Sequence, residues 1–260
     1  MYSNEHIIYL RKEKRNKRFI LFFKIFILIA FLGLWEFCAR YEIINPFLTS
    51  YPSKVVVTVL NLFKENDLLV HIWVTVYETL ISFFLASLIG VLIASILQSS
   101  NTVSKILDPY LTVLNSLPKI SLGPLIIIWI GANVNSIIFM ALLISVFTTI
   151  INMYNAFLST DKSKIILMKS FGASKMQIFT KLILRSNVPS LINALKINIS
   201  LSLIGVIMGE LLVSKQGLGY LITYGSQIFN LNLVITSIFI LGIISYVLYI
   251  AIDLLERKIK

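Results

Sequence analysis

Long apolar runs recur along nearly the whole chain and are separated by shorter polar segments. A run of roughly 20 mostly apolar residues is long enough to cross a bilayer as a helix. Such runs occupy residues 19–39, 72–97, 120–130, 136–157, 189–213 and 233–254. The pattern predicts an all-α, polytopic membrane protein with about six transmembrane helices.

The third run is the weakest of these candidates. It is short, and Pro118 and Pro124 interrupt it. Because proline lacks a backbone donor and clashes with the preceding turn, we expect a broken or tilted helix here, preceded by a cytoplasmic stretch from Lys105.

In the segment before the second run, Pro52 and Ser53 indicate a helix start. An amphipathic helix on the outer surface should follow, with apolar residues at Val56, Val59, Leu60 and Phe63.

The distribution of basic residues predicts the orientation. The chain is 57% hydrophobic and 13% charged, with a formal net charge of +11. With the N-terminus inside, the inner segments hold most lysines and arginines, including Lys105 and Lys119, whereas the outer segments hold only Arg40, Lys54, Lys64 and Lys215. The positive-inside rule then places both termini in the cytoplasm.

The chain divides into a basic N-terminal segment, 1–18, and a single transmembrane domain, 19–260. No soluble domain remains to bind nucleic acid.

Residues 158–188 form the longest predicted cytoplasmic segment between spans. Ile165, Met168 and Phe171 recur at helical spacing, as do Met176, Phe179 and Leu182 in a second piece. Gly172 separates the two pieces and suits a left-handed residue that ends a helix. The residues alone leave two interpretations open. One is a hairpin on the membrane surface whose lysines meet anionic lipid, and the other is an apolar ridge that docks on a cytoplasmic partner.

The segments "FGASKMQIF…VPSLINALK" and "GELLVSKQGLGYLI" resemble the EAA-loop region of ABC-importer permeases. The resemblance is strongest to the branch that serves nitrate, sulfonate, taurine and thiamine-precursor uptake. "LWEFCARYEIINPFLTSYPSKVV" and "LDPYLTVLNSLPKISLGPLIIIWIGAN" are similar to further parts of that pattern, so it covers nearly the whole chain in order. In place of Glu-Ala-Ala this chain has Ile166, Leu167 and Met168, whereas Gly172 and Ala173 match the loop's core.

The resemblance implies a type I importer permease that works by alternating access for a small solute. It implies a second permease copy, two cytoplasmic ABC ATPase subunits, and an extracellular or lipid-anchored solute-binding protein. The ATPase-coupling residues would be Ile165, Ile166, Met168, Phe171, Gly172, Ala173, Met176 and Phe179. The sequence holds no G-x-x-x-x-G-K-[ST] phosphate loop. We therefore expect no enzyme activity and no bound cofactor in this chain, and ATP hydrolysis in a partner.

The fifth run carries the candidates for a pathway or gate. Gly205 and Gly209 form a G-x-x-x-G pattern, which allows helices to approach closely. Ionisable residues inside a span are expensive, so Glu210, Glu78 and Lys196 stand out. Lys196 is near enough to the inner end to snorkel, and Asp253 near a span end needs no special role. The pathway or gate candidates are Asn198, Ser202, Gly205, Gly209 and Glu210.

Other functions are less well supported by the sequence. Cys38 is the only cysteine, and the two histidines are isolated, so neither a disulfide nor a metal site is expected. The alternative is a stand-alone secondary transporter, or another polytopic membrane protein, that is not coupled to an ATPase. A secondary transporter would usually show paired broken helices in two related halves, with ion-coupling acids at mid-depth, and the sequence shows no such pattern.

Overall fold

The computed structural model describes residues 4–65 and 67–259, which contain helices and no strand. Lys260, one of the basic residues that the charge distribution assigns to the cytoplasm, lies outside this range. The long helices are α1 (Asn4–Arg40), α4 (Asp67–Ser99), α7 (Val134–Leu158), α11 (Val188–Val213) and α13 (Leu231–Ile259). The shorter elements are α2 (Pro46–Thr49), α3 (Pro52–Lys64), α5 (Asn101–Ser116), η1 (Lys119–Leu122), α6 (Gly123–Ile130), α8 (Lys162–Ser170), α9 (Lys175–Ile178), the π-helical η2 (Phe179–Ile183), α10 (Leu184–Ser186) and α12 (Leu218–Gln227).

The predicted spans are confirmed. Five of the described helices are long and apolar enough to cross a membrane. The third predicted span is broken, as expected: the helical segments Asn101–Ser116 and Lys119–Ile130 meet at 82°. The stretch from Lys105 differs from the expectation, because it belongs to α5, a helix that packs beside α4 and α7 with Pro109 inside it.

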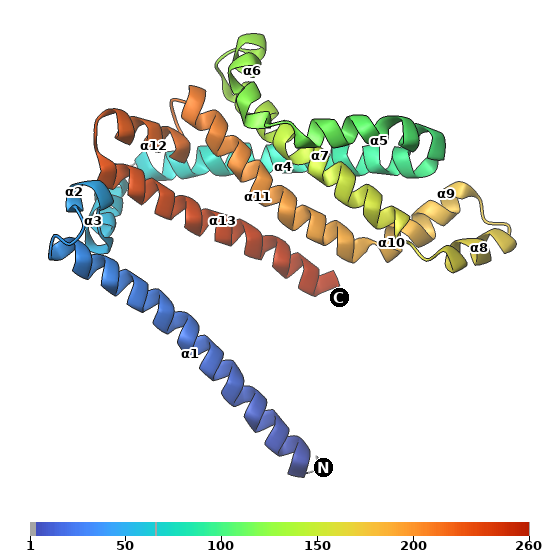
Figure 1. Ribbon diagram of the computed structural model, residues 1–260, viewed down its shortest axis with the longest axis horizontal. Coiled ribbons are helices and arrows are strands. Elements are labelled where there is room, and N and C mark those ends of the chain that lie inside the picture. Colours follow the sequence, from blue (N-terminus) through green and yellow to red (C-terminus); the bar gives the residue numbers. More distant parts are fainter. Residues whose placement is uncertain (1–3, 66, 260) are drawn as a thin grey trace.

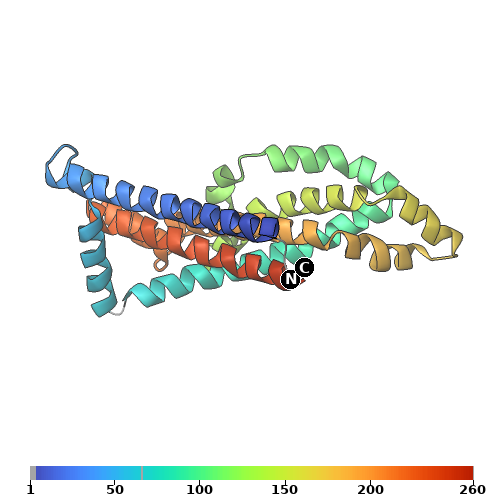
Figure 2. The same cartoon turned by 90° about the horizontal axis from the view of Figure 1, so that it is seen from below.

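The long helices α4, α7, α11 and α13 run side by side along the long axis of the molecule (Figure 1). One end of this bundle carries α8, α9 and α10, and we call it the loop end. The opposite end carries α2, α3 and α12, and we call it the cap end. Figure 2 shows α3 lying across the long helices at the cap end. Both chain termini point toward the loop end (Figure 1).

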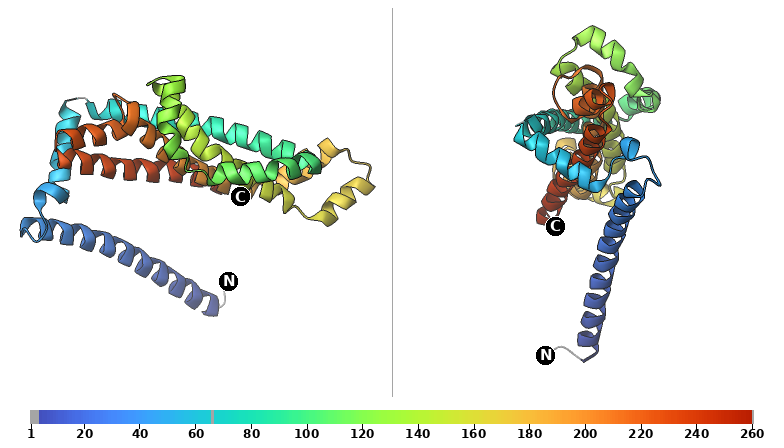
Figure 3. Two further views of the ribbon diagram at one scale, coloured as in Figure 1. Left: turned by 45° about the horizontal axis from the view of Figure 1, so that its top comes forward. Right: turned by 90° about the vertical axis from the view of Figure 1, so that its left-hand side faces the viewer.

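Helix α1 stands apart from the bundle (Figures 1 and 3). It is held mainly near its C-terminal end, where the Trp35 ring stacks on Phe239 at 5.4 Å between centroids. Glu36 accepts hydrogen bonds from the backbone N–H and the hydroxyl of Ser53, at 3.0 and 2.8 Å. This confirms the helix start predicted at Pro52, since Glu36 holds the first turn of α3. From Phe19 to Phe37, α1 exposes large apolar side chains, which suits a helix surrounded by lipid.

Helices α7 and α11 approach each other closely at two glycines. A Cβ added at Gly205 would lie 2.4 Å from the Ala141 Cα, and one at Gly209 would lie 2.8 Å from Ile137 Cγ2. No side chain fits in these two places. The G-x-x-x-G pattern therefore allows the backbones of α7 and α11 to come into contact, as such patterns do between other membrane helices. We call this contact the α7–α11 seam.

The seam gives a first testable expectation. Gly205→Ala should lower the stability of the detergent-solubilised protein by about 1–3 kcal/mol, because the added methyl collides with backbone and the helices must move apart. Gly242→Ala is the matched control, since no atom lies within 4 Å of its added Cβ. Thermal unfolding of both variants measures the difference. Equal melting temperatures for the two would contradict the importance of the seam.

Candidate functional site

The segment 158–188 folds as a hairpin of two short helices. Asp161 caps α8 by accepting a hydrogen bond from the Ser163 N–H at 2.8 Å. Gly172 has φ +76°, a left-handed conformation that favours glycine, and it ends the helix as predicted. Ser174 and Gln177 then form a reciprocal capping box that starts α9. The sequence of caps explains why the chain turns sharply at Gly172.

The inner face of this hairpin packs against the helix bundle. Ile165, Met168, Ala173 and Phe179 pack against a buried cluster that includes Met153 and Phe157 on α7 and Ala94 on α4. The rings of Phe157 and Phe179 meet edge to face, with 5.5 Å between centroids. The periodic stripe in the sequence therefore marks mainly the side that holds the hairpin to the bundle. These four residues are half-buried by their packing against the bundle.

The outer face of the hairpin is apolar and exposed. Phe171 is 80% exposed, Met176 69%, Ile166 66% and Leu167 55%. We call these four residues the exposed ridge. Sequence periodicity missed Leu167, and it grouped Phe171 and Met176 with inward-facing neighbours. The signal that identifies the ridge is the loss of the family's Glu-Ala pair at positions 166 and 167, which this chain replaces with two large apolar residues.

The residues predicted to line a pathway lie inside the bundle. Asn198 is 1% exposed and donates a hydrogen bond to Ser87 on α4 at 2.6 Å. Ser202 is fully buried and donates to the Asn198 side-chain oxygen at 3.3 Å. Gly205 and Gly209 form the α7–α11 seam described above. In this conformation these four residues join α11 to α4 and α7 and do not face an open space.

Glu210, the fifth predicted residue, holds a turn at the cap end. It is 1% exposed and accepts hydrogen bonds from the Thr75 hydroxyl at 2.7 Å and the Gly219 N–H at 2.6 Å. Thr75 in turn accepts from the Leu218 N–H at 2.9 Å, and His71 accepts from the Gly217 N–H at 2.9 Å. These contacts, which we call the cap-end clasp, bind three successive backbone donors at the start of α12. Glu210 is thus an internal ligand for backbone, and not a glutamate that reaches water.

Two other acidic positions also differ from expectation. Glu78 is 1% exposed, so it does not lie at a solvent-exposed rim of its span. Asp253 accepts a hydrogen bond from Lys196 at 2.5 Å, and Glu256 accepts another from the same ammonium at 2.7 Å. Lys196 is therefore paired inside the protein between α11 and α13, and does not snorkel to the surface.

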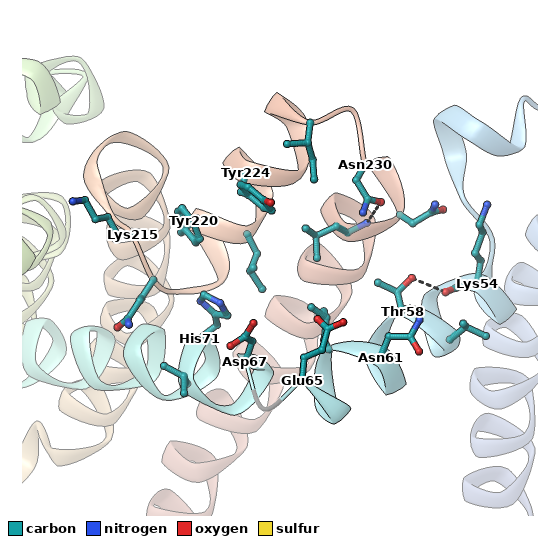
Figure 4. A pocket seen from close by; sticks show the side chains of 18 residues that line it. Lys54, Thr58, Asn61, Glu65, Asp67, His71, Lys215, Tyr220, Tyr224 and Asn230 are labelled. Atoms are coloured by element: carbon teal, nitrogen blue, oxygen red, sulfur yellow. Dashed lines mark hydrogen bonds between the residues drawn. The ribbon is translucent and has the colours of Figure 1, made fainter.

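The cap end also carries a cavity of about 820 Å³ (Figure 4). It lies between α3, the start of α4, α12 and the start of α13. The turn Gln216–Ile222 contributes Gln216, Tyr220 and Leu221 to its wall. The charged and polar lining residues are Lys54, Thr58, Asn61, Glu65, Asp67, His71, Lys215, Tyr224, Asn230 and Asn232.

The fold and these sites define a class: a polytopic helical membrane protein with a hairpin that exposes apolar side chains at one end. A family model described as "Binding-protein-dependent transport system inner membrane component" matches residues 86–260, and the chain belongs to this family. It is accordingly a multi-pass inner-membrane permease subunit of an ABC importer, in the branch that the sequence resembles.

The chain is also similar to individual permease proteins and to a solved transporter structure. The chain is 29% identical to the formylaminopyrimidine transport permease protein ThiX of Halalkalibacterium halodurans over 229 residues, which cover 88% of this chain and 91% of the relative. It is 24% identical to the putative aliphatic sulfonates transport permease protein SsuC of Bacillus subtilis over 249 residues, covering 96% and 90%. An inward-facing structure of the MetNI methionine ABC transporter matches with TM-score 0.66 and 22% identity, over 73% of this chain and 94% of that one. This likeness confirms the fold.

The cap-end clasp can be tested through Glu210. We expect Glu210→Leu to destabilise the protein by about 2–5 kcal/mol, because the Thr75 hydroxyl and the Gly219 N–H lose their buried acceptor. Glu210→Gln should cost less, since its amide oxygen still accepts one of these bonds. Thermal unfolding in detergent would compare both with Glu65→Leu, a change at an exposed residue of the same end. A Glu210→Leu protein as stable as this control would contradict the clasp.

Proposed function

We propose that the hairpin of residues 158–188 docks on a separate cytoplasmic ATPase subunit and transmits nucleotide-driven motion to the spans. The observation that carries this proposal is the exposed ridge of Ile166, Leu167, Phe171 and Met176. An exposed cluster of large apolar side chains on a rigid, capped hairpin is the kind of surface that a protein partner covers. Loss of the loop's usual glutamate at Ile166 removes one polar contact and adds apolar area, so docking by burial is retained.

The rest of the assembly follows from the same proposal. The loop end faces the cytoplasm, together with both termini, as the basic residues predict. A second copy of the chain, as a homodimer, completes a path for the solute. An extracellular or lipid-anchored solute-binding protein delivers the solute at the cap end, where the cavity of Figure 4 and the clasp lie. The chain itself binds no ATP and carries out no hydrolysis.

Alternating access gives a role to the buried residues of α11. Asn198, Ser202, Gly205, Gly209 and Glu210 lie where α11 meets α4, α7 and α12, so a change of tilt between these helices must pass through them. They are gate candidates because their contacts differ between two packings of the same helices. The names of the relatives suggest the cargo, a small solute of the sulfonate, taurine, nitrate or thiamine-precursor kind.

The docking proposal is tested at the centre of the exposed ridge. Phe171→Asp should reduce co-purification of the ATPase and ATP-dependent uptake at least about tenfold, because a charge in a buried interface costs more than 1.4 kcal/mol. Phe229→Asp is the matched control: Phe229 is 75% exposed and lies at the cap end. Both variants should fold, since both side chains are mostly exposed.

Two other outcomes would contradict the docking proposal. If Phe171→Asp keeps the ATPase but loses binding to vesicles that contain anionic lipid, the hairpin is a membrane-surface element. If the intact chain never co-purifies with an ATPase and Gly172→Pro leaves uptake unchanged, the chain works without one. Proline at residue 172 cannot adopt the φ of +76° that the turn requires.

A further inference from the structure

Lys119 does not lie at the cytoplasmic end of the bundle, to which the distribution of basic residues assigns it. The positive-inside reading puts it in a cytoplasmic segment, yet its ammonium lies 5.7 Å from the ring centroid of Phe147. Phe147 is in the middle of α7, which runs from Val134 to Leu158. At a rise of about 1.5 Å per residue, the ring is roughly 16–20 Å from either end of that helix. Lys119 is therefore at mid-depth of the bundle, directly after the bend of the broken span.

The ammonium of Lys119 has no carboxylate partner among the residues that the structure describes. Its one hydrogen bond goes to the Asn115 carbonyl at 2.8 Å, and the Phe147 ring attracts it without neutralising it. Lys196 is the contrast, because two carboxylates hold it. Asp108 is on the same face of α5, but it lies seven residues before Asn115, which is about 10 Å along the helix. An uncompensated charge at this depth is expensive, and it calls for water or an anion.

The surroundings of Lys119 are polar on both helices that meet there. On α5, Thr112, Asn115 and Ser116 are exposed and share the face that leads to the bend. On α7, Thr148 donates a hydrogen bond to the Asn115 side-chain oxygen at 3.4 Å. Further along α7 toward the loop end, Asn152 and Asn155 continue this face, at helical spacing from Thr148. Polar side chains beside a broken backbone occur at membrane depth where they line a water-filled space.

We propose that Lys119 is an anion-binding residue of the translocation path, and that the transported solute carries a sulfonate, carboxylate or similar small anionic group. This inference rests on the proposed transport function and names its substrate class. An ammonium with three donors recognises a compact anionic group of this kind. The Phe147 ring beneath it and the Asn115 carbonyl beside it fix its position. Lipid phosphates are excluded as the natural ligand, because they lie about 15 Å away at the bilayer surface.

The experiment measures the electrostatic field near Lys119 in the full-length chain, reconstituted in proteoliposomes without ATPase. Cys38→Ser removes the native thiol, and Ser116→Cys adds one beside the bend. The labelling rates of this thiol are compared for an anionic sulfonatoethyl and a cationic trimethylammonioethyl methanethiosulfonate. We expect Lys119→Gln to lower the anionic-to-cationic ratio about 5- to 30-fold, as expected for one unit charge a few ångströms away. Lys119→Arg should preserve the ratio.

Two further arms complete the test. Ser226→Cys at the exposed end of α12 is the matched control, and its ratio should not respond to Lys119→Gln. Excess ethanesulfonate should slow labelling of Ser116→Cys, whereas ethylammonium should not, and Lys119→Gln should abolish this protection.

Three results would overturn the proposal. The first is no labelling of Ser116→Cys by either reagent, which would place the bend away from water. The second is a ratio that Lys119→Gln leaves unchanged. If that variant instead only lowers the melting temperature, Lys119 merely caps the carbonyls at the end of α5. The third is equal protection by ethanesulfonate and ethylammonium. Because no ATPase is present, these outcomes are independent of the docking test at Phe171.

Discussion

The close approach of α7 and α11 is the contact on which the rest of the structure depends. Lipid tails are as apolar as leucine, so burying side chains between membrane helices gains little, and the bundle relies on close van der Waals contact and internal hydrogen bonds. Gly205 over Ala141 and Gly209 over Ile137 provide that contact. Helix α7 also packs along α4, so it is the central element to which both neighbours are fixed.

Several polar and charged groups inside this bundle are paired with other groups of the protein, at either end. At the cap end, Glu210, Thr75 and His71 bind three backbone donors that begin α12. Toward the loop end, Lys196 is held by carboxylates of α13. Lys119 differs because its charge is oriented but not neutralised. Lys196 therefore has a structural role, because two carboxylates pair with it. Lys119, at mid-depth and without a carboxylate partner among the described residues, is the charge that we propose binds the solute.

The hairpin of residues 158–188 has two apolar faces with different tasks. Its inner face belongs to the cluster around Phe157 and moves with α4, α7 and α11. Its outer face, the exposed ridge, offers apolar area at the loop end. Because short caps fix the turn at Gly172, the two faces are rigidly connected. In the proposed coupling, a force that an ATPase applies to the ridge reaches the spans through these packed side chains.

The sequence by itself determined the spans, the break near Pro118, the hairpin with its turn at Gly172, and the family. The first three follow from local properties: the length of apolar runs, the missing donor of proline and the conformational freedom of glycine. The family follows from the resemblance of longer segments that recur in order along the chain. Only the tertiary structure decided which side of each helix faces inward. Periodicity in Ile165 and Met168 shows that a helix has an apolar side, but not whether that side meets the bundle or a partner. In the same way, Lys196 and Lys119 are both lysines beside apolar runs. Their different roles depend on carboxylates more than fifty residues away in one case and on none in the other, and only the folded chain brings such distant residues together.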